Sequence, residues 1–292
     1  MPGKIWSYIM GIRIITDSTT EFTQEEAKKL NIEIVPLKSL FGNEVYLDGI
    51  DLSPAEFYEK LEAADKLPTT SQPAPHEFEQ VFREAQANGD QIIAICIASV
   101  LSGTWQSACI AKENCGGDIW VIDSEVATIT LQILVRLAIS LRDSGKTAEE
   151  IVSIIEKEKK TLCLLAAIDT LEYLNKGGRL SKAQTIMGGM LNIKPIVTLD
   201  EGHIKVMGKC RGIKNAYKKI FDYVNDVGGI DYSKPFAIGY TGNRDRFNDF
   251  EEVCKNHLGK HKPIIGSIGS VVGTHAGPGA VAITFFKSDS SI

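Results

Sequence analysis

Hydroxyl side chains are concentrated in two short segments that could bind an anion. Thr70 and Ser71 follow a proline and precede a helix start, where helix capping and ligand contact are both open interpretations. Ser102, Gly103 and Thr104 stand between an apolar run and another helix start. Gly103 permits close approach of a backbone, and the first amides of a helix favour a carboxylate or phosphate. Ser102 is therefore placed to bind an anion or to act as a nucleophile, with a plain turn as the alternative.

His275 is the histidine that the sequence favours for chemistry, because it lies in a turn rich in Gly and Pro that would hold it in place. With Ser102 as the nucleophile and Asp17 or Asp123 to orient it, His275 would complete a serine hydrolase. Val100 stands where the first Gly of a GxSxG nucleophile elbow belongs, which counts against this function. Asp17 and Asp123 could also bind a metal, although such residues at strand ends more often brace a loop.

Basic residues form two clusters in a chain whose formal net charge is -5. Lys176 and Arg179 belong to one cluster, and Lys205, Lys209 and Arg211 to the other. They predict a docking site for an acidic or phosphate-bearing partner, with ordinary solvated surface as the alternative. The net charge disfavours a DNA-binding regulator, and no nucleic-acid-binding motif is recognisable.

The elements that must position these residues alternate between strand, loop and helix through the first half of the chain. Nearly continuous apolar runs such as 91–98 and 118–122 are typical of strands buried on both faces. The alternation predicts an α/β domain over residues 10–160, with a parallel sheet covered by helices. Its hydroxyl-rich loops would lie at the carboxyl ends of the strands, where such sheets bind ligands.

The second half of the chain predicts an α+β domain over residues 161–292 with a mostly antiparallel sheet. A tight turn at residues 200–203 would join two strands as a hairpin. Residues 264–272 and 281–286 are expected to close the domain as strands on either side of the turn that carries His275.

Composition limits the class of protein. Hydrophobic residues make up 43% of the chain and charged residues 24%, as in an ordinary globular protein. The 6 cysteines form no CxxC pair and no metal-ligand spacing, which favours a reducing cytoplasm. No apolar run approaches the roughly 20 residues of a membrane span. The strand pattern begins at Gly11, so we expect Met10 to be the natural start and residues 1–9 an extension.

The chain resembles the DegV family in the order of its motifs, which are ITDST, TSQP, LSGTWQSA, VIDS, LEYLNKGGRLS, LNIKPIV, GKCRG and HAGPGA. The resemblance implies a two-domain protein that holds one long-chain fatty acid in a tunnel between its domains. It also implies a cytoplasmic, lipid-carrying subunit without catalytic activity or cofactor, which presents the carboxylate to an ATP-dependent fatty-acid kinase. A transient contact with a membrane is compatible with this role. The main alternative is a serine hydrolase that acts on a lipid or acyl ester through Ser102 and His275, and a carrier of another amphipathic acid would differ only in its ligand.

The resemblance also assigns residues. It makes Thr70, Ser102 and His275 the ligands of the carboxylate, and Arg179 a surface residue that docks the partner. We expect Ser71, Gly103, Thr104 and Thr128 to join the ligand site, and Lys209 and Arg211 to join the docking site. The chain departs from the family at Thr130 and Gln132, where glycines are usual, and larger residues lining a tunnel would shorten or bend it.

Overall fold

The amino-terminal part of the molecule contains the predicted parallel sheet. The computed structural model describes residues 11–180 and 192–288, so residues 1–9 and Met10 lie outside the described part. All neighbouring strands of the sheet run parallel. Across the sheet the order is β2 (Ile32–Val35), β1 (Ile12–Asp17), β6 (Gln91–Cys96) and β7 (Ile119–Asp123).

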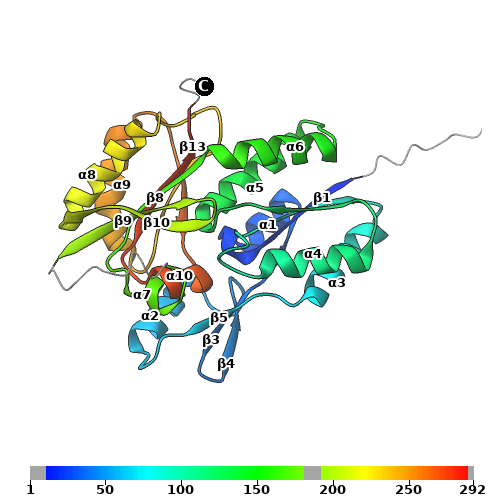
Figure 1. Ribbon diagram of the computed structural model, residues 1–292, viewed down its shortest axis with the longest axis horizontal. Helices are drawn as coiled ribbons and strands as arrows, with labels where there is room; N and C mark the ends of the chain where they lie inside the picture. The colour runs from blue at the N-terminus through cyan, green and yellow to red at the C-terminus, as the bar shows by residue number, and fades with distance from the viewer. Residues whose placement is uncertain (1–10, 181–191, 289–292) are drawn as a thin grey trace, which may run out of the picture.

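Helices cover both faces of this sheet, which is why its central strand β6 and its neighbour β7 are almost entirely apolar (Figure 1). Ile15 packs with Phe78 and Phe82 beneath α3 and α4, whereas Ile14 packs on the opposite side with residues of α5. Capping boxes start several helices, including the predicted one in which Thr23 and Glu26 bond each other's backbone. The helices and 3-10 turns of this half are η1 (Ser18–Thr20), α1 (Gln24–Leu30), α2 (Pro54–Ala63), α3 (Pro75–Ala87), α4 (Thr104–Cys115), α5 (Thr128–Asp143), α6 (Ala148–Glu158) and η2 (Lys159–Thr161).

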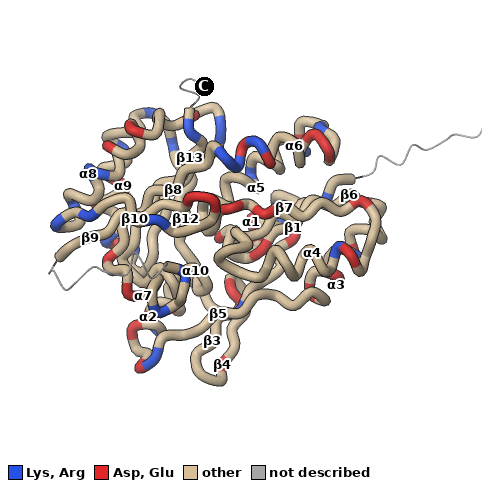
Figure 2. The backbone as a smooth tube through the Cα atoms, in the orientation of Figure 1, with Lys and Arg blue, Asp and Glu red and all other residues tan. Residues whose placement is uncertain are grey.

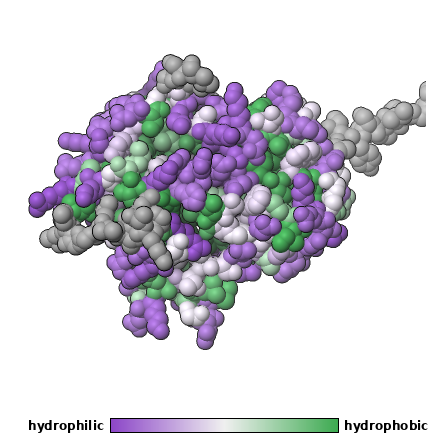
Figure 3. All heavy atoms as spheres, in the orientation of Figure 1, coloured by the Kyte–Doolittle hydropathy of each residue, from purple (hydrophilic) through white to green (hydrophobic). Residues whose placement is uncertain are grey.

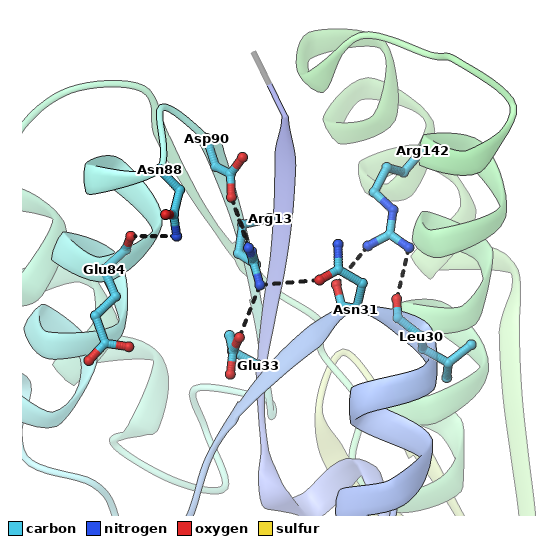
Figure 4. Close-up of polar contacts among 8 residues, drawn as sticks. All are labelled: Arg13, Leu30, Asn31, Glu33, Glu84, Asn88, Asp90 and Arg142. Atoms are coloured by element: carbon cyan, nitrogen blue, oxygen red, sulfur yellow. Dashed lines mark hydrogen bonds and ion pairs between the residues drawn. The ribbon is translucent and has the colours of Figure 1, made fainter. Parts of the chain in front are cut away.

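The two ends of the parallel strands have different chemistry. At the amino ends, Arg13 forms ion pairs with Glu33 and Asp90 at 3.0 and 3.1 Å and hydrogen-bonds Asn31 (Figure 4). The charged side chains at the amino ends of the strands are therefore paired with one another. The carboxyl ends lead into the hydroxyl-rich loops and face the second half of the molecule.

A small antiparallel sheet contains the first of the hydroxyl segments. Its order is β4 (Glu44–Leu47), β3 (Lys38–Phe41) and β5 (Thr69–Ser71). The turn residues Gly42 and Asn43 predict the hairpin of its first two strands, but the third strand was not expected. Thr70 pairs with Ser39 of β3, so the segment expected to be a loop is a short strand. Three residues carry too little periodicity to be recognised as a strand, and the long-range pairing with β3 defines it.

The carboxy-terminal half is built on a mostly antiparallel sheet, as predicted, and only β11 and β12 run parallel among its described pairs. Successive side chains of a strand point to opposite faces. In β8, Cys163 and Leu165 pack beneath α8 and α9, whereas Leu164 and Ala166 face the amino-terminal half. The strands in order are β10 (His203–Arg211), β9 (Ile193–Asp200), β8 (Leu162–Ala167), β13 (Val281–Phe286), β11 (Ala237–Tyr240) and β12 (Ile264–Ser267), and the helices are α7 (Glu172–Lys176), α8 (Ile213–Asp226), α9 (Arg244–Leu258) and α10 (Ser270–Ala276).

The segment before the final strand differs from its prediction. The expected strand over residues 264–272 ends at Ser267, and α10 follows from Ser270. His275 therefore lies in the last turn of a helix rather than in a Gly-Pro turn. At the start of α10, the backbone amides of Gly269 and Ser270 donate to the carboxylates of Glu21 and Asp48. Residues distant in the chain therefore satisfy the free amides of this helix.

Hydrophilic side chains dominate the face seen in Figure 3, with apolar residues in separate patches. Within residues 11–180 and 192–288, no helix is long and apolar enough to cross a membrane. The proposed domain boundary at residue 160 falls within η2 and stays a prediction.

Candidate functional site

A cavity of about 400 Å³ lies between the carboxyl ends of the parallel strands and the inner face of the antiparallel sheet. Ala166 of β8 and Ala282 of β13 stand opposite each other in register, and both line the cavity. Methyl side chains at paired positions leave space that larger residues would fill. The volume falls in the range of small-molecule sites. Further apolar walls come from Ile97, Leu101, Leu164, Val197, Leu199 and Val271.

One end of this apolar cavity is polar. Thr70 Oγ1 lies 3.0 Å from His275 Nε2, which joins β5 to α10 across the two halves. Arg179 lies near this pair and donates from Nε to the Leu101 carbonyl at 3.1 Å. Ser102 follows Leu101 and also lines the cavity, with its Oγ 2.8 Å from Thr104 Oγ1. Hydroxyl, imidazole and guanidinium groups are therefore gathered where the apolar walls end.

The predicted ligand residues divide into two groups. Lining the cavity are Thr70, Ser71, Ser102, Thr128 and His275. Gly103 and Thr104 are not among the lining residues, but Gly103 is the N-cap of α4, and Thr104 is its first residue. The alternative role of Thr70 and Ser71 as helix caps is wrong, because Ala74 occupies the N-cap of α3.

Gln72 is a lining residue that sequence reasoning missed. Its Nε2 donates to Ser107 Oγ of α4 at 3.3 Å. A Cβ at Gly103 would come within 2.2 Å of the Gln72 side chain, so the glycine lets the two hydroxyl segments approach. The TSQP motif contained Gln72, but nothing in its type or spacing singled it out.

The His275 ring is held in its neutral form. Burial and, to a smaller extent, the nearby Arg179 charge together lower the pKa of His275 to about 4. Its Nδ1 is buried and has no hydrogen-bond partner in the described part of the chain. At neutral pH the imidazole therefore offers one N–H and one lone pair, without a positive charge.

Two carboxylates, one buried and one half-buried, fasten α10 to the amino-terminal half and were also missed from the sequence. Asp48 Oδ1 accepts from the Ser270 amide at 2.9 Å and the Ser270 hydroxyl at 2.7 Å. Glu21 accepts from the Gly269 amide at 2.7 Å and from the Thr128 hydroxyl at 3.1 Å. Burial raises the pKa of both carboxyls, and the charge of Asp48 raises that of Glu21 further. The Thr128 hydroxyl is thus already engaged by protein.

The serine hydrolase arrangement is not assembled. Asp17 accepts from the Thr19 and Ile97 amides, and Asp123 accepts from the Ser99 amide, so both brace loops. Burial raises the pKa of Asp17 to about 6. In the described residues no hydrogen bond joins His275 to Ser102 or to either aspartate, and no group of three or more His, Cys, Asp or Glu side chains could hold a metal.

The expected docking residues lie in two places. Arg179 was expected at the surface, but it is half-buried and lines the cavity, with Nη1 2.6 Å from the Gly177 carbonyl. Lys209 and Arg211 are exposed on the outer strand β10, beside a part of the molecule rich in Lys and Arg (Figure 2).

The residues that replace the usual glycines do not shape the cavity directly. Thr130 and Gln132 are buried on α5, and neither lines the cavity. Thr130 Oγ1 and Gln132 Oε1 have no hydrogen-bond partner among the described residues. Any effect of these two residues on the length or shape of the cavity must therefore act through the position of α5.

Comparisons with known proteins agree on one family. Residues 11–288 match the family model described as "Uncharacterised protein, DegV family". A DegV domain-containing protein of Caldanaerobacter subterraneus is 38% identical over 276 residues, which cover 94% of this chain and 98% of that protein. A solved structure described as "Fatty Acid Binding of a DegV family Protein from Thermus thermophilus" is 30% identical, with a TM-score of 0.87 over 95% of this chain and 100% of that one. DegV of Bacillus subtilis, described as a fatty acid binding protein, is 32% identical, with a TM-score of 0.83 over 95% of this chain and 100% of that one.

Proposed function

The chain belongs to the DegV family, and from this membership we propose that it binds one long-chain fatty acid in the cavity between its two sheets. The acyl chain lies along the apolar walls, and the carboxylate lies at the end formed by Thr70, Ser102 and His275. The observation that carries the proposal is an apolar cavity that ends in a cluster of hydrogen-bond donors. The Thermus and Bacillus structures, described as fatty-acid-binding, support it.

Burial of the chain supplies enough free energy for tight binding. Each buried methylene contributes about 0.8 kcal/mol, so a sixteen-carbon acid gains roughly 11 kcal/mol before costs. Nanomolar affinity corresponds to about 12 kcal/mol. An apolar cavity therefore accounts for most of the affinity, and the polar end needs only to offset the cost of burying the carboxylate.

The polar end offers several donors for that purpose. An unpaired buried charge costs several kcal/mol. The hydroxyls of Thr70 and Ser102 can donate to the carboxylate, the first amides of α4 add a favourable dipole, and Arg179 adds positive charge nearby. Arg179 already donates to the carbonyls of Leu101 and Gly177, so it does not need to form a bidentate clamp on the ligand. One carboxylate oxygen then stays available to a partner enzyme.

The second part of the proposal concerns that partner. The protein acts as a cytoplasmic carrier that presents the carboxylate to an ATP-dependent fatty-acid kinase and has no catalytic activity of its own. Lys209 and Arg211 form an exposed basic pair suited to an acidic partner surface. Arg179 would contact a partner from the rim of the cavity, since it is only half-buried.

Native mass spectrometry of the purified protein tests the first part. We expect a mass increment of one fatty acid, which organic extraction releases and identifies. A protein that is empty and also refuses added fatty acids would refute the proposal. For the second part, a fatty-acid kinase should phosphorylate the bound lipid, and Lys209→Glu combined with Arg211→Glu should slow phosphorylation without changing lipid affinity. Equal rates with both proteins would exclude this docking surface.

A further inference from the structure

The helix ends of α7 and α10 meet through two glycines. A Cβ at Gly177, directly after α7, would lie 2.1 Å from His275 Nδ1. Reciprocally, a Cβ at Gly277, directly after α10, would lie 2.3 Å from the Tyr173 ring. Gly177 has a helical backbone with φ of -74°, which any residue adopts. The close approach of the imidazole, and not the backbone, therefore requires glycine at position 177.

This packing gives the two ring nitrogens of His275 different surroundings. Nδ1 faces the Gly177 backbone and has no hydrogen-bond partner among the described residues. Nε2 lies 3.0 Å from Thr70 Oγ1, at the polar end of the cavity. A neutral imidazole carries one N–H, and a buried N–H without an acceptor is rarer in proteins than an unpaired acceptor. The proton therefore belongs on Nε2.

We propose that Gly177 is a positioning residue that holds His275 as the neutral Nε2–H tautomer, so that the Thr70 hydroxyl donates to the ligand carboxylate. In this arrangement Nε2–H donates to Thr70 Oγ1, and the hydroxyl hydrogen of Thr70 is left for the ligand. With the opposite tautomer, Thr70 would donate to the Nε2 lone pair and present only its own lone pairs to a carboxylate, which would repel it. The inference rests on the proposed binding of a fatty acid.

The charge beside His275 favours the same arrangement. Arg179 Nη1 donates to the Gly177 carbonyl, which places a positive charge near the buried side of the ring. A second positive charge on the imidazole is therefore disfavoured, in line with the low pKa of His275. The segment that follows α7 thus contributes both the glycine that fits the ring and the cation that disfavours a charge on it.

The tautomer is tested by nitrogen NMR of protein labelled with 15N-histidine, with and without palmitate. The expected spectrum has Nε2 of His275 in the protonated range and Nδ1 in the unprotonated range, and His275→Gln assigns the signals. A protonated Nδ1, or a doubly protonated ring at pH 7, would overturn the proposal. Because the spectrum of the free protein is also informative, the test stands even if palmitate does not bind.

The role of Gly177 is tested by Gly177→Ala. This variant should lose roughly ten- to a hundredfold in affinity for palmitate, the effect of losing one hydrogen bond to a charged group, but little for the matching hexadecanol. Equal losses for both ligands would indicate a merely structural role, and no loss for either would remove Gly177 from the site.

A double-mutant cycle keeps the test independent of ligand binding. Gly177→Ala should lower stability toward urea in the wild-type background, because the added Cβ meets the imidazole. In a His275→Ala background the same change should be neutral or stabilising, since the backbone is already helical. Equal destabilisation in both backgrounds would contradict the contact. Failure of the wild-type protein to bind either ligand would count against the proposed function and leave this cycle intact.

Discussion

Replacing Ala282 by leucine should shorten the longest acyl chain that the cavity accepts. Ala282 lines the cavity opposite Ala166, so three added carbon atoms enter space in which we propose that the chain lies. The affected length is roughly three methylenes at about 0.8 kcal/mol each, or about 2.4 kcal/mol of binding free energy. The affinity for a sixteen-carbon acid should fall roughly fiftyfold.

Calorimetric titration with saturated acids of increasing length is the suitable assay. The wild-type and Ala282→Leu proteins should bind short acids equally, and the affinity of the variant should stop rising about three carbons earlier. Ala87→Leu is a matched control, because Ala87 is exposed on α3 and undergoes the same chemical change away from the cavity. Urea unfolding of both variants separates loss of binding from loss of fold.

Two results would refute the reasoning. If Ala282→Leu binds every chain length as the wild type does, the chain does not pass between β8 and β13. If it weakens all lengths equally while the fold is intact, the leucine disturbs the polar end instead of displacing methylenes. Only a loss that grows with chain length agrees with the geometry.

Three further predictions follow from the buried polar groups. The pKa of His275 falls from 6.5 to about 4 on folding. The stability that this histidine contributes is therefore complete above pH 6.5 and is lost as the pH falls toward 4, by roughly 3 kcal/mol. Subtracting the pH profile of His275→Gln from that of the wild type separates this contribution from the opposite one of Asp17, and a flat difference would contradict the prediction. Asp48→Ala should lower the free energy of unfolding by about 3 kcal/mol, because the donors at the start of α10 lose their acceptor. Asp48→Asn should lower it by less, and equal losses of stability in the two variants would argue against the hydrogen bonds. A fluorophosphonate probe should leave Ser102 unlabelled, because its hydroxyl is hydrogen-bonded to Thr104 and no base is hydrogen-bonded to it in the described residues. Labelling that Ser102→Ala abolishes would instead support the hydrolase function.

The architecture was predictable where local patterns decide it. Continuous apolar runs identify β6 and β7 as strands buried on both faces, and the turn after Asp200 identifies the β9–β10 hairpin. The loops that follow β1, β6 and β7 could be placed at one edge of the sheet because the strands are parallel. Ser102 and Thr128 were accordingly expected near a ligand site, and both line the cavity.

The remaining features depend on residues far apart in the chain. The start of α10 has no local cap, because Asp48 and Glu21 supply its acceptors from the other half, and the sequence around Ser270 therefore favoured a strand. The requirement for glycine at position 177 could not be recognised for the same reason, because it comes from the His275 ring that packs on Gly177. The resemblance implied a surface position for Arg179, and a charged residue beside two glycines gives no hint of the carbonyls that it binds.

The clamp on α10 also has a consequence for synthesis on the ribosome. Three hydrogen bonds hold α10 in place, and the residues that they join are far apart in the chain. The separations are 205 positions for Thr70 and His275, 222 for Asp48 and Ser270, and 248 for Glu21 and Gly269. A nascent chain that has emerged only as far as β7 can build the parallel sheet, since its strands pair with one another alone. The cavity lacks one whole wall until β8, β9, α10 and β13 have followed. A chain that is still being synthesised therefore has no complete cavity, and a ligand can be enclosed only after β13 has left the ribosome.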